Sequence, residues 1–127
     1  MDGAMNRTAQ LARLLHVLGV ESRVRIIELL RGNEALCVGA LAARLGISQS
    51  AVSQHLRILG DAGLVLAERR GYYIHYRLSP RGLAGCRKRV LRLLDVPAER
   101  DRDRCVRQKG GETVCAKKKA SVRSPNT

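Results

Sequence analysis

The stretch LGISQSAVSQHLRIL, residues 45–59, decides the fold. Gly46 is the residue type that ends a helix in the left-handed conformation, and Ser48 is a good N-cap for a following helix. Apolar residues then recur at helical spacing at Val52, Leu56 and Leu59. This pattern predicts a helix from about residue 49 to residue 60 with one buried face. A short helix, a tight turn and a second helix predict a helix-turn-helix.

Three more helices are predicted upstream of this helix. Leucines at helical spacing predict an amphipathic helix over residues 7–18. A wider apolar face predicts a central helix from about residue 21 until Gly32 and Asn33 stop it. A third short helix runs from about Cys37 to Leu45 and ends before Gly46. With no Phe and no Trp in the chain, the core must consist of Leu, Val, Ile and Ala.

A β-hairpin and a fifth helix follow the helix-turn-helix. Residues 64–68 and 72–78 have strand character, and Arg69, Arg70 and Gly71 between them predict the turn. Ser79-Pro80 is a strong helix start, and apolar residues then continue at helical spacing until Pro97. The predicted fold is therefore mainly α-helical, five helices with a small hairpin between the fourth and fifth, in a winged helix-turn-helix architecture.

The polar face of the predicted fourth helix suits a DNA major groove. Opposite its buried residues lie four side chains at helical spacing, namely Ser50, Ser53, Gln54 and Arg57. Gln can bind an adenine edge in two places, Arg a guanine edge, and Ser a base or a phosphate. Ser48, Gln49 and His55 complete the predicted DNA-binding set on this helix. The alternative is a neutral polar surface, although such a helix more often carries Glu and Lys.

Arg69 and Arg70 are predicted at the hairpin tip, where they would reach phosphates or an adjacent minor groove. At that position they are expected to add affinity more than sequence preference. The alternative is that they only keep the tip soluble.

Composition agrees with a nucleic-acid partner. The 127 residues carry 24 Lys and Arg against 11 Asp and Glu, a net charge of +13, which attracts polyanions. Charge alone also fits a basic architectural protein that binds any duplex, a reading that stays open. No apolar run approaches 18 residues, so we expect a cytoplasmic protein without membrane contact. His16, His55 and His75 fall in no catalytic motif, which argues against an enzyme.

Two regions are predicted along the chain. Residues 1–95 would form the DNA-binding and dimerisation domain. Residues 96–127 alternate in charge, contain Lys117-Lys118-Lys119 and end in polar residues, which is typical of a basic, flexible tail. This tail holds two of the four cysteines, Cys105 and Cys115.

Residues from about 11 to 94 resemble the ArsR/SmtB family of metal- and metalloid-responsive winged-helix repressors. The most specific match is residues 45–59, continued by Ala62-Gly63-Leu64-Val65 and by wing residues including Arg70-Gly71 and Tyr76. The resemblance implies a homodimer joined by the first and fifth helices. It also implies binding to an inverted repeat near a promoter and release when an inducer binds. Two unpaired apolar stripes at the ends of the domain agree with such a dimer.

The sensing sites of that family match this chain only in part. The site at the start of the third helix usually reads Glu-Leu-Cys-Val-Cys-Asp-Leu, whereas residues 35–41 here read ALCVGAL, which retains only Cys37. A second family site uses Asp and His of paired fifth helices to hold zinc, and residues 79–95 contain no His. The first site is therefore incomplete here, and the second is not expected.

Cys105 and Cys115 are the leading candidate ligands, because nearby Arg and Lys favour the thiolate. Trivalent arsenic prefers three sulfur donors, so Cys86 or Cys37 would complete a site for arsenite or another thiophilic ion. DNA binding itself is expected to need no cofactor. Alternatively, Cys105 and Cys115 form a redox-responsive disulfide, and Cys86 and Cys37 serve as small hydrophobic residues. The sequence leaves the inducer open.

Overall fold

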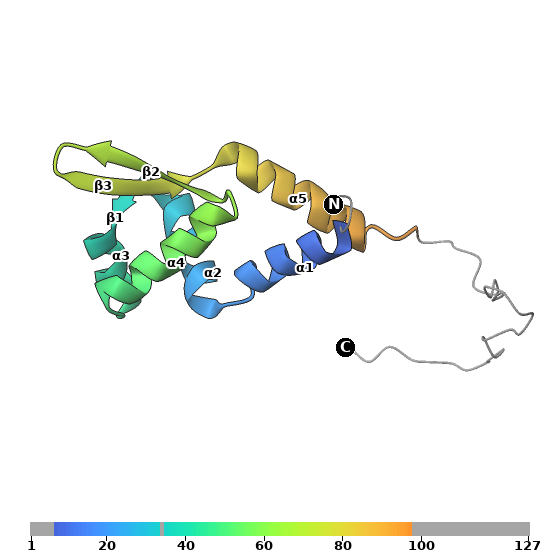
Figure 1. The fold of residues 1–127 in the computed structure, drawn as a ribbon, viewed down its shortest axis with the longest axis horizontal. Helices are drawn as coiled ribbons and strands as arrows, with labels where there is room; N and C mark the ends of the chain where they lie inside the picture. The colour runs from blue at the N-terminus through green and yellow to red at the C-terminus, as the bar shows by residue number, and fades with distance from the viewer. Residues whose placement is uncertain (1–6, 34, 98–127) are drawn as a thin grey trace, which may run out of the picture. The chain divides into compact units, whose positions relative to one another are not determined.

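The computed structural model describes residues 7–33 and 35–97. By its internal contacts the chain divides into two units, Met1–Asp95 and Val96–Thr127. The first unit contains all the helices and strands described, in the order α1 (Arg7–Leu18), α2 (Glu21–Gly32), β1 (Leu36–Cys37), α3 (Val38–Leu45), α4 (Gln49–Asp61), β2 (Val65–Arg70), β3 (Tyr73–Leu78) and α5 (Pro80–Leu94). Figure 1 shows the hairpin and α3 at one end of this unit and paired α1 and α5 at the other.

The five predicted helices are confirmed. Helices α1 to α4 each bury apolar residues in the core, whereas α5 contributes only the partly buried Leu83 and Cys86. The fully buried centre combines residues from α2, α3, α4 and the segment that follows α4: Ile26, Leu41, Val52, Leu56, Leu59 and Leu64. The predicted turn is also present, with Gly46 left-handed at φ +72°. The Ser48 hydroxyl accepts a hydrogen bond from the Ala51 amide (3.1 Å) at the start of α4. These two residues fix the direction in which α4 leaves the turn.

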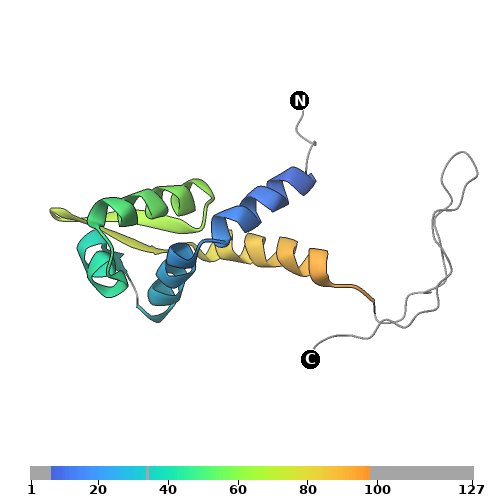
Figure 2. The same cartoon turned by 90° about the horizontal axis from the view of Figure 1, so that it is seen from below.

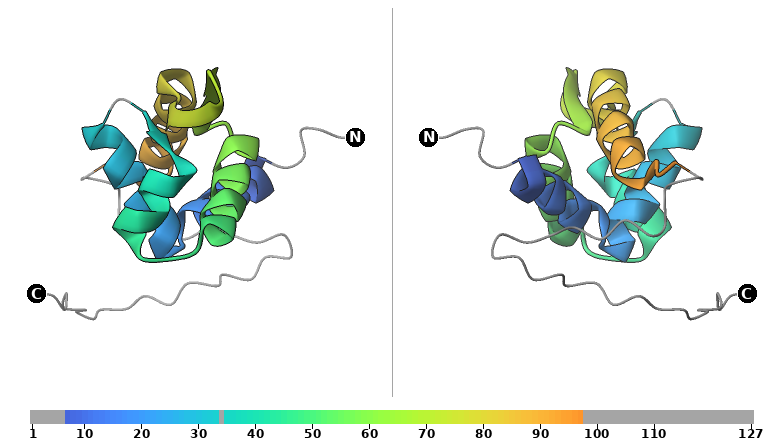
Figure 3. Two further views of the ribbon diagram at one scale, coloured as in Figure 1. Left: turned by 90° about the vertical axis from the view of Figure 1, so that its left-hand side faces the viewer. Right: turned by 90° about the vertical axis from the view of Figure 1, so that its right-hand side faces the viewer.

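The sheet has three strands in the order β1-β3-β2, all antiparallel. Strand β1 is only two residues long and was not predicted, because two residues show no alternation. It pairs Leu36 with Tyr76 and Cys37 with His75. In the end-on views of Figure 3, α3 and α4 lie below the hairpin. The wing is thus tied to the helix-turn-helix along β1.

The predicted turn of the hairpin was wrong by two residues. Arg69 and Arg70 are not in the turn; they end β2, paired with Ile74 and Tyr73 of β3. The turn consists of Gly71 and Tyr72, and Gly71 has φ +64°. A two-residue hairpin turn needs positive φ at its first position, which glycine adopts without strain. Strand pairing therefore continues up to the glycine, and Tyr72 leaves its predicted strand.

Helix α5 begins against the segment that precedes the wing. Ser79 is buried, its amide donates to the Leu64 carbonyl (2.9 Å), and its hydroxyl accepts from the Gly82 amide (3.0 Å). A Cβ at position 82 would overlap the carbonyl of Gly63, so only glycine allows this approach. The contact fixes where α5 starts, and Figure 2 shows α5 running from there away from the hairpin.

Candidate nucleic-acid interface

Helix α4 presents a polar face to solvent, opposite its buried residues. The four side chains of this face are all exposed, namely Ser50, Ser53, Gln54 and Arg57. Behind them Val52 and Leu59 are 0% exposed, so the helix cannot rotate about its axis without exposing its core residues. The rigid core therefore holds two serines, one amide and one guanidinium in a row. We call these four residues the α4 polar face.

Ser48 and Gln49 are exposed at the N-terminus of α4. The Ser48 hydroxyl is engaged as the helix cap and also lies 3.3 Å from the Ser50 hydroxyl. Unpaired amides at the first turn of a helix attract phosphate oxygens, and no acidic residue occupies the first turn of α4. The beginning of α4 is thus exposed and free of negative charge, while a DNA-binding role of these two residues stays a prediction.

His55 lies beside the α4 polar face and is half-buried. Its Nδ1 accepts a hydrogen bond from Nε of Arg23 on α2 (3.2 Å), and the same guanidinium donates to the carbonyl of Val17 at the end of α1 (3.1 Å). Burial, and secondly the charge of Arg23, lower the pKa of His55. Through Arg23, His55 links α4 to α2 and α1. The sequence did not reveal this link because Arg23 and His55 lie 32 positions apart.

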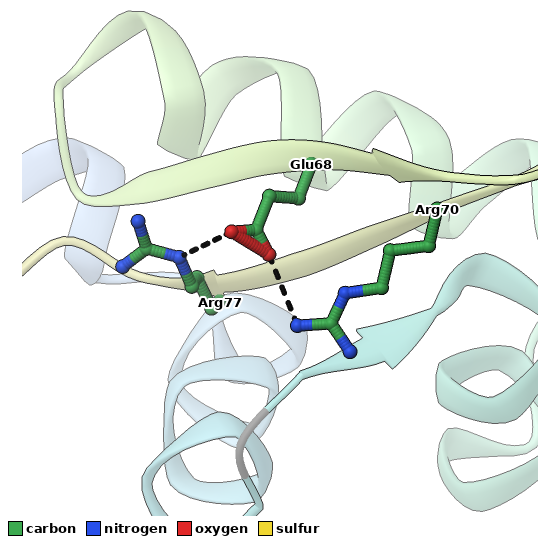
Figure 4. Close-up of polar contacts among 3 residues, drawn as sticks. All are labelled: Glu68, Arg70 and Arg77. Carbon is green, nitrogen blue, oxygen red and sulfur yellow. Dashed lines mark hydrogen bonds and ion pairs between the residues drawn. The ribbon is translucent and has the colours of Figure 1, made fainter.

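On the wing, Glu68 of β2 engages two arginines (Figure 4). Its carboxylate lies 3.1 Å from Arg70 and 3.3 Å from Arg77 of β3. The hydrogen bond from Arg70 is the main cause that lowers the pKa of Glu68, and Arg77 adds to the effect. Arg70 is thus partly neutralised, whereas Arg69, also exposed, faces the other side of the hairpin. The two predicted wing arginines therefore differ in their charge environment.

The two described thiols are in different settings. Cys86 packs against the core on α5, and burial raises the pKa of its thiol against the opposing effect of Arg89. A thiol with a raised pKa ionises less readily to the thiolate that binds a metal ion. Cys37 is half-buried at the N-terminus of α3, across from His75, whose Nδ1 is buried without a hydrogen-bond partner in the described chain.

Across residues 7–33 and 35–97, no three His, Cys, Asp or Glu side chains group as metal ligands would. Cys105 and Cys115 lie outside the described residues. A thiophilic ion would thus need donors beyond those that the described part of the chain brings together.

The outer faces of α1 and α5 are apolar and uncovered. Leu91, Leu93 and Leu94 of α5 are more than half exposed, as is Val96, and Leu15 of α1 is 38% exposed. The N-terminal end of α1 and the C-terminal end of α5 lie at the end of the domain opposite to the hairpin turn (Figures 1 and 2). Several exposed large apolar residues on two neighbouring helices suggest an interaction surface. None of the described helices is long and apolar enough to cross a membrane.

A helix-turn-helix with a capped, polar-faced second helix and an adjoining hairpin defines the winged helix-turn-helix class of DNA-binding domains. Residues 21–66 match the family model described as "Bacterial regulatory protein, arsR family". The crystal structure of a "possible transcriptional regulator for arsenical resistance" is 38% identical, with a TM-score of 0.59, covering 69% of this chain and 85% of that one. The chain therefore belongs to the ArsR family, which consists of transcriptional regulators and not of enzymes.

Two further relatives are informative. The arsenical resistance operon repressor of Escherichia coli is 41% identical over 68 residues, 54% of this chain and 58% of the repressor. This chain thus spans less than two thirds of the length of that relative. The solution structure of a homodimeric winged helix-turn-helix DNA-binding domain from Mycobacterium bovis is 29% identical, with a TM-score of 0.56, covering 75% of this chain and 89% of that one.

Proposed function

We propose that this protein is a homodimeric transcriptional repressor that reads a DNA inverted repeat with the α4 polar face. The observation that carries the proposal is the row of four exposed side chains on a helix whose opposite face is fully buried. Such a helix enters a major groove with a fixed orientation, and its Gln54 and Arg57 can each contact two atoms of a base edge. Ser48, Gln49 and Arg69 would bind phosphates, which position the protein without reading sequence.

The dimer in this proposal is formed by α1 and α5. Its support is the uncovered leucines on these helices, together with the homodimeric state of the relative from Mycobacterium bovis. A two-fold dimer would place two copies of α4 about 34 Å apart, one turn of the duplex, so that both enter the major groove on one side. An inverted repeat is the sequence symmetry that matches such a dimer.

The proposed inducer is arsenite or another thiophilic ion bound by cysteine thiolates. The likeness to the E. coli arsenical resistance repressor supports an ion of this class. Within the described chain Cys37 is chosen over Cys86, because partial burial raises the pKa of the Cys86 thiol. Cys105 and Cys115 would supply the remaining sulfur donors. Binding would favour the form of the dimer that binds DNA poorly; full release needs a preference of about 5.5 kcal/mol.

The DNA-reading part is tested with a duplex selected from a random library by the wild-type protein. Gel shifts with this duplex measure Gln54→Ala and Arg57→Ala. The control is Arg25→Ala, which removes the same positive charge as Arg57→Ala but from an exposed site on α2. Each α4 variant should lose about 1–3 kcal/mol of discrimination against unselected DNA, and Arg25→Ala should lose none. If the α4 variants instead lose affinity for selected and unselected duplexes equally, the result would indicate an architectural protein that binds any sequence.

The inducer is tested by titrating release of the same duplex with arsenite, antimonite, cadmium, zinc and peroxide. Cys37→Ser, Cys105→Ser and Cys115→Ser should each weaken release by arsenite, and Cys86→Ser should not. If only peroxide releases the duplex, and the mass of the protein shows that Cys105 and Cys115 have lost two hydrogens, the inducer would be a redox signal and not an ion. Unchanged binding in saturating arsenite would eliminate arsenite as the inducer.

A further inference from the structure

The outer end of the hairpin exposes three consecutive apolar or aromatic residues, with Tyr72 in the turn and Tyr73 and Ile74 on opposite faces of β3. Tyr72 is 99% exposed, Tyr73 is 66% exposed and Ile74 is 41% exposed, whereas the third tyrosine of the chain, Tyr76, packs against the core. A consecutive run of two aromatic residues and one aliphatic residue in water is costly unless another surface covers it. We call residues 72–74 the wing-tip patch.

The backbone places Tyr72 at the outermost position of the hairpin. Pairing of Arg70 with Tyr73 closes the two strands, so the turn consists only of Gly71 and Tyr72. Because Gly71 has no side chain, Tyr72 supplies the only side chain of the two-residue turn. The turn lies at the end of the domain opposite to the free ends of α1 and α5 (Figures 1 and 2). The patch is therefore remote from the proposed dimer surface and adjoins the DNA-reading end.

The positive charges near the tip are restrained, so they would not by themselves hold the tip on DNA. Arg70, next to the turn, is engaged by Glu68, so its attraction for phosphates is reduced. Arg69 remains as a cation on the opposite side of β2. An aromatic tip with restrained cations is suited to a narrow site that has apolar walls and hydrogen-bond acceptors on its floor.

The minor groove of DNA is such a site. It is about 6 Å wide, its walls are deoxyribose rings, and every A·T pair presents only acceptors on its floor. We propose that Tyr72 enters the minor groove beside the segment contacted by α4, packs its ring on the sugars and donates its hydroxyl to an A·T pair. The exocyclic amine of guanine would obstruct the ring, so this contact selects A·T-rich flanks. The inference rests on the proposed DNA binding and adds a second, aromatic readout to it.

The first test compares Tyr72→Ala and Tyr72→Phe on the duplex selected by wild-type protein. Tyr72→Ala should weaken binding about tenfold, the scale of about 1.4 kcal/mol expected for one lost aromatic contact. The slope of affinity against salt should stay unchanged, because no charge is removed. Tyr72→Phe should retain most of the affinity and lose part of the A·T preference. Leu66→Ala, a half-exposed apolar residue at the base of the same hairpin, is the control and should bind as wild type.

The second test locates the contact. Replacing flanking adenines by 2,6-diaminopurine adds the amine to the minor groove and leaves the major-groove edge of A·T intact. This change should weaken wild-type protein and leave Tyr72→Ala unaffected. Because the chain contains no Trp, Tyr72→Trp places a single tryptophan at the tip, and its selectively excited emission should change when the selected duplex is added.

Two results overturn the inference while DNA reading by α4 stands: wild-type affinity of Tyr72→Ala, or an equal effect of diaminopurine on both proteins. Emission of Tyr72→Trp that changes only on protein self-association would assign the patch to a second copy of the chain and also overturn it. Failure of the proposed function itself would appear differently, as a wild-type protein that selects no sequence at all.

Discussion

At the scale of single residues, Arg23 connects three helices through one guanidinium. It donates to the Val17 carbonyl on α1 and to Nδ1 of His55 on α4, so it joins a proposed dimerisation helix to the proposed reading helix. Protonated His55 cannot accept this hydrogen bond. Burial and the charge of Arg23 both lower the pKa of His55, so the folded protein favours the neutral imidazole.

This linkage predicts a pH-dependent stability. The unfolded chain, with an ordinary histidine pKa of about 6.5, binds the His55 proton more readily than the folded chain. The free energy of unfolding should therefore be greatest above about pH 6.5 and decline as the pH falls toward the lower folded-state value. His55→Gln should remove this part of the slope, and Arg23→Gln should reduce it. Urea unfolding followed by circular dichroism between pH 5 and 8 measures it; identical slopes for wild type and His55→Gln would contradict the linkage.

The residues that sequence reasoning identified were those with a local signal. Gly46, Ser48 and the α4 polar face follow from capping rules and helical spacing, and their exposure or conformation agrees with prediction. The Arg23–His55 contact and the Glu68 pairs have no local signal, because they depend on tertiary packing or on strand register. Tyr72 was missed because an aromatic residue favours strands, while the positive φ at Gly71 outweighed this preference.

At the scale of elements, α5 depends on one close approach. A Cβ at position 82 would overlap the Gly63 carbonyl, whereas one at position 85 of the same helix would meet nothing. Gly82→Ala should destabilise the fold by about 3 kcal/mol, because the start of α5 must shift. Gly85→Ala should stabilise it by up to about 1 kcal/mol through helix propensity. Urea denaturation of the two variants measures the contrast, and equal effects would contradict the packing of α5.

The wing is an element whose charge is restrained by Glu68. Glu68→Gln should release Arg70 and Arg77 and raise the affinity for any duplex, with a salt dependence steeper by about one to two phosphate contacts. The matched control is Glu21→Gln, which removes the same charge from an exposed site on α2 and should leave the salt dependence unchanged. Gel shifts across a salt series measure both slopes. If Glu68→Gln binds with the wild-type slope, the two arginines do not reach phosphates.

Elements were predicted well where they were long. Each of the five helices carries its apolar stripe over two or more turns, so periodicity located them, and α4 extends only one residue beyond its predicted end. Strand β1 escaped prediction because its two residues form a strand only through their pairing with β3. The hairpin was predicted, but its register was not, since the register of a hairpin is fixed by the turn type and the length of the loop, and the loop was placed over the wrong residues.

For the whole molecule, reading of an inverted repeat requires a dimer, which we propose forms through α1 and α5. Leu91→Glu places a charge among the uncovered leucines. Burying one unpaired carboxylate costs more than about 1.4 kcal/mol, so self-association should weaken at least about tenfold. Affinity for the inverted repeat should fall with it. Val24→Glu, a similarly exposed apolar site on α2, should remain dimeric. Sedimentation equilibrium decides, and a Leu91→Glu protein that dimerises like wild type would contradict the proposed interface.

Sequence reading by α4 is measured most directly by a selection from random duplexes with the fourfold variant Ser50→Ala, Ser53→Ala, Gln54→Ala and Arg57→Ala. The four substitutions replace exposed side chains on a helix whose core residues are untouched, so folding and dimerisation should persist and are checked by circular dichroism and sedimentation. If α4 reads the sequence, wild-type protein should enrich an inverted repeat and the variant should enrich no sequence. Enrichment of the same repeat by both proteins would contradict reading by α4.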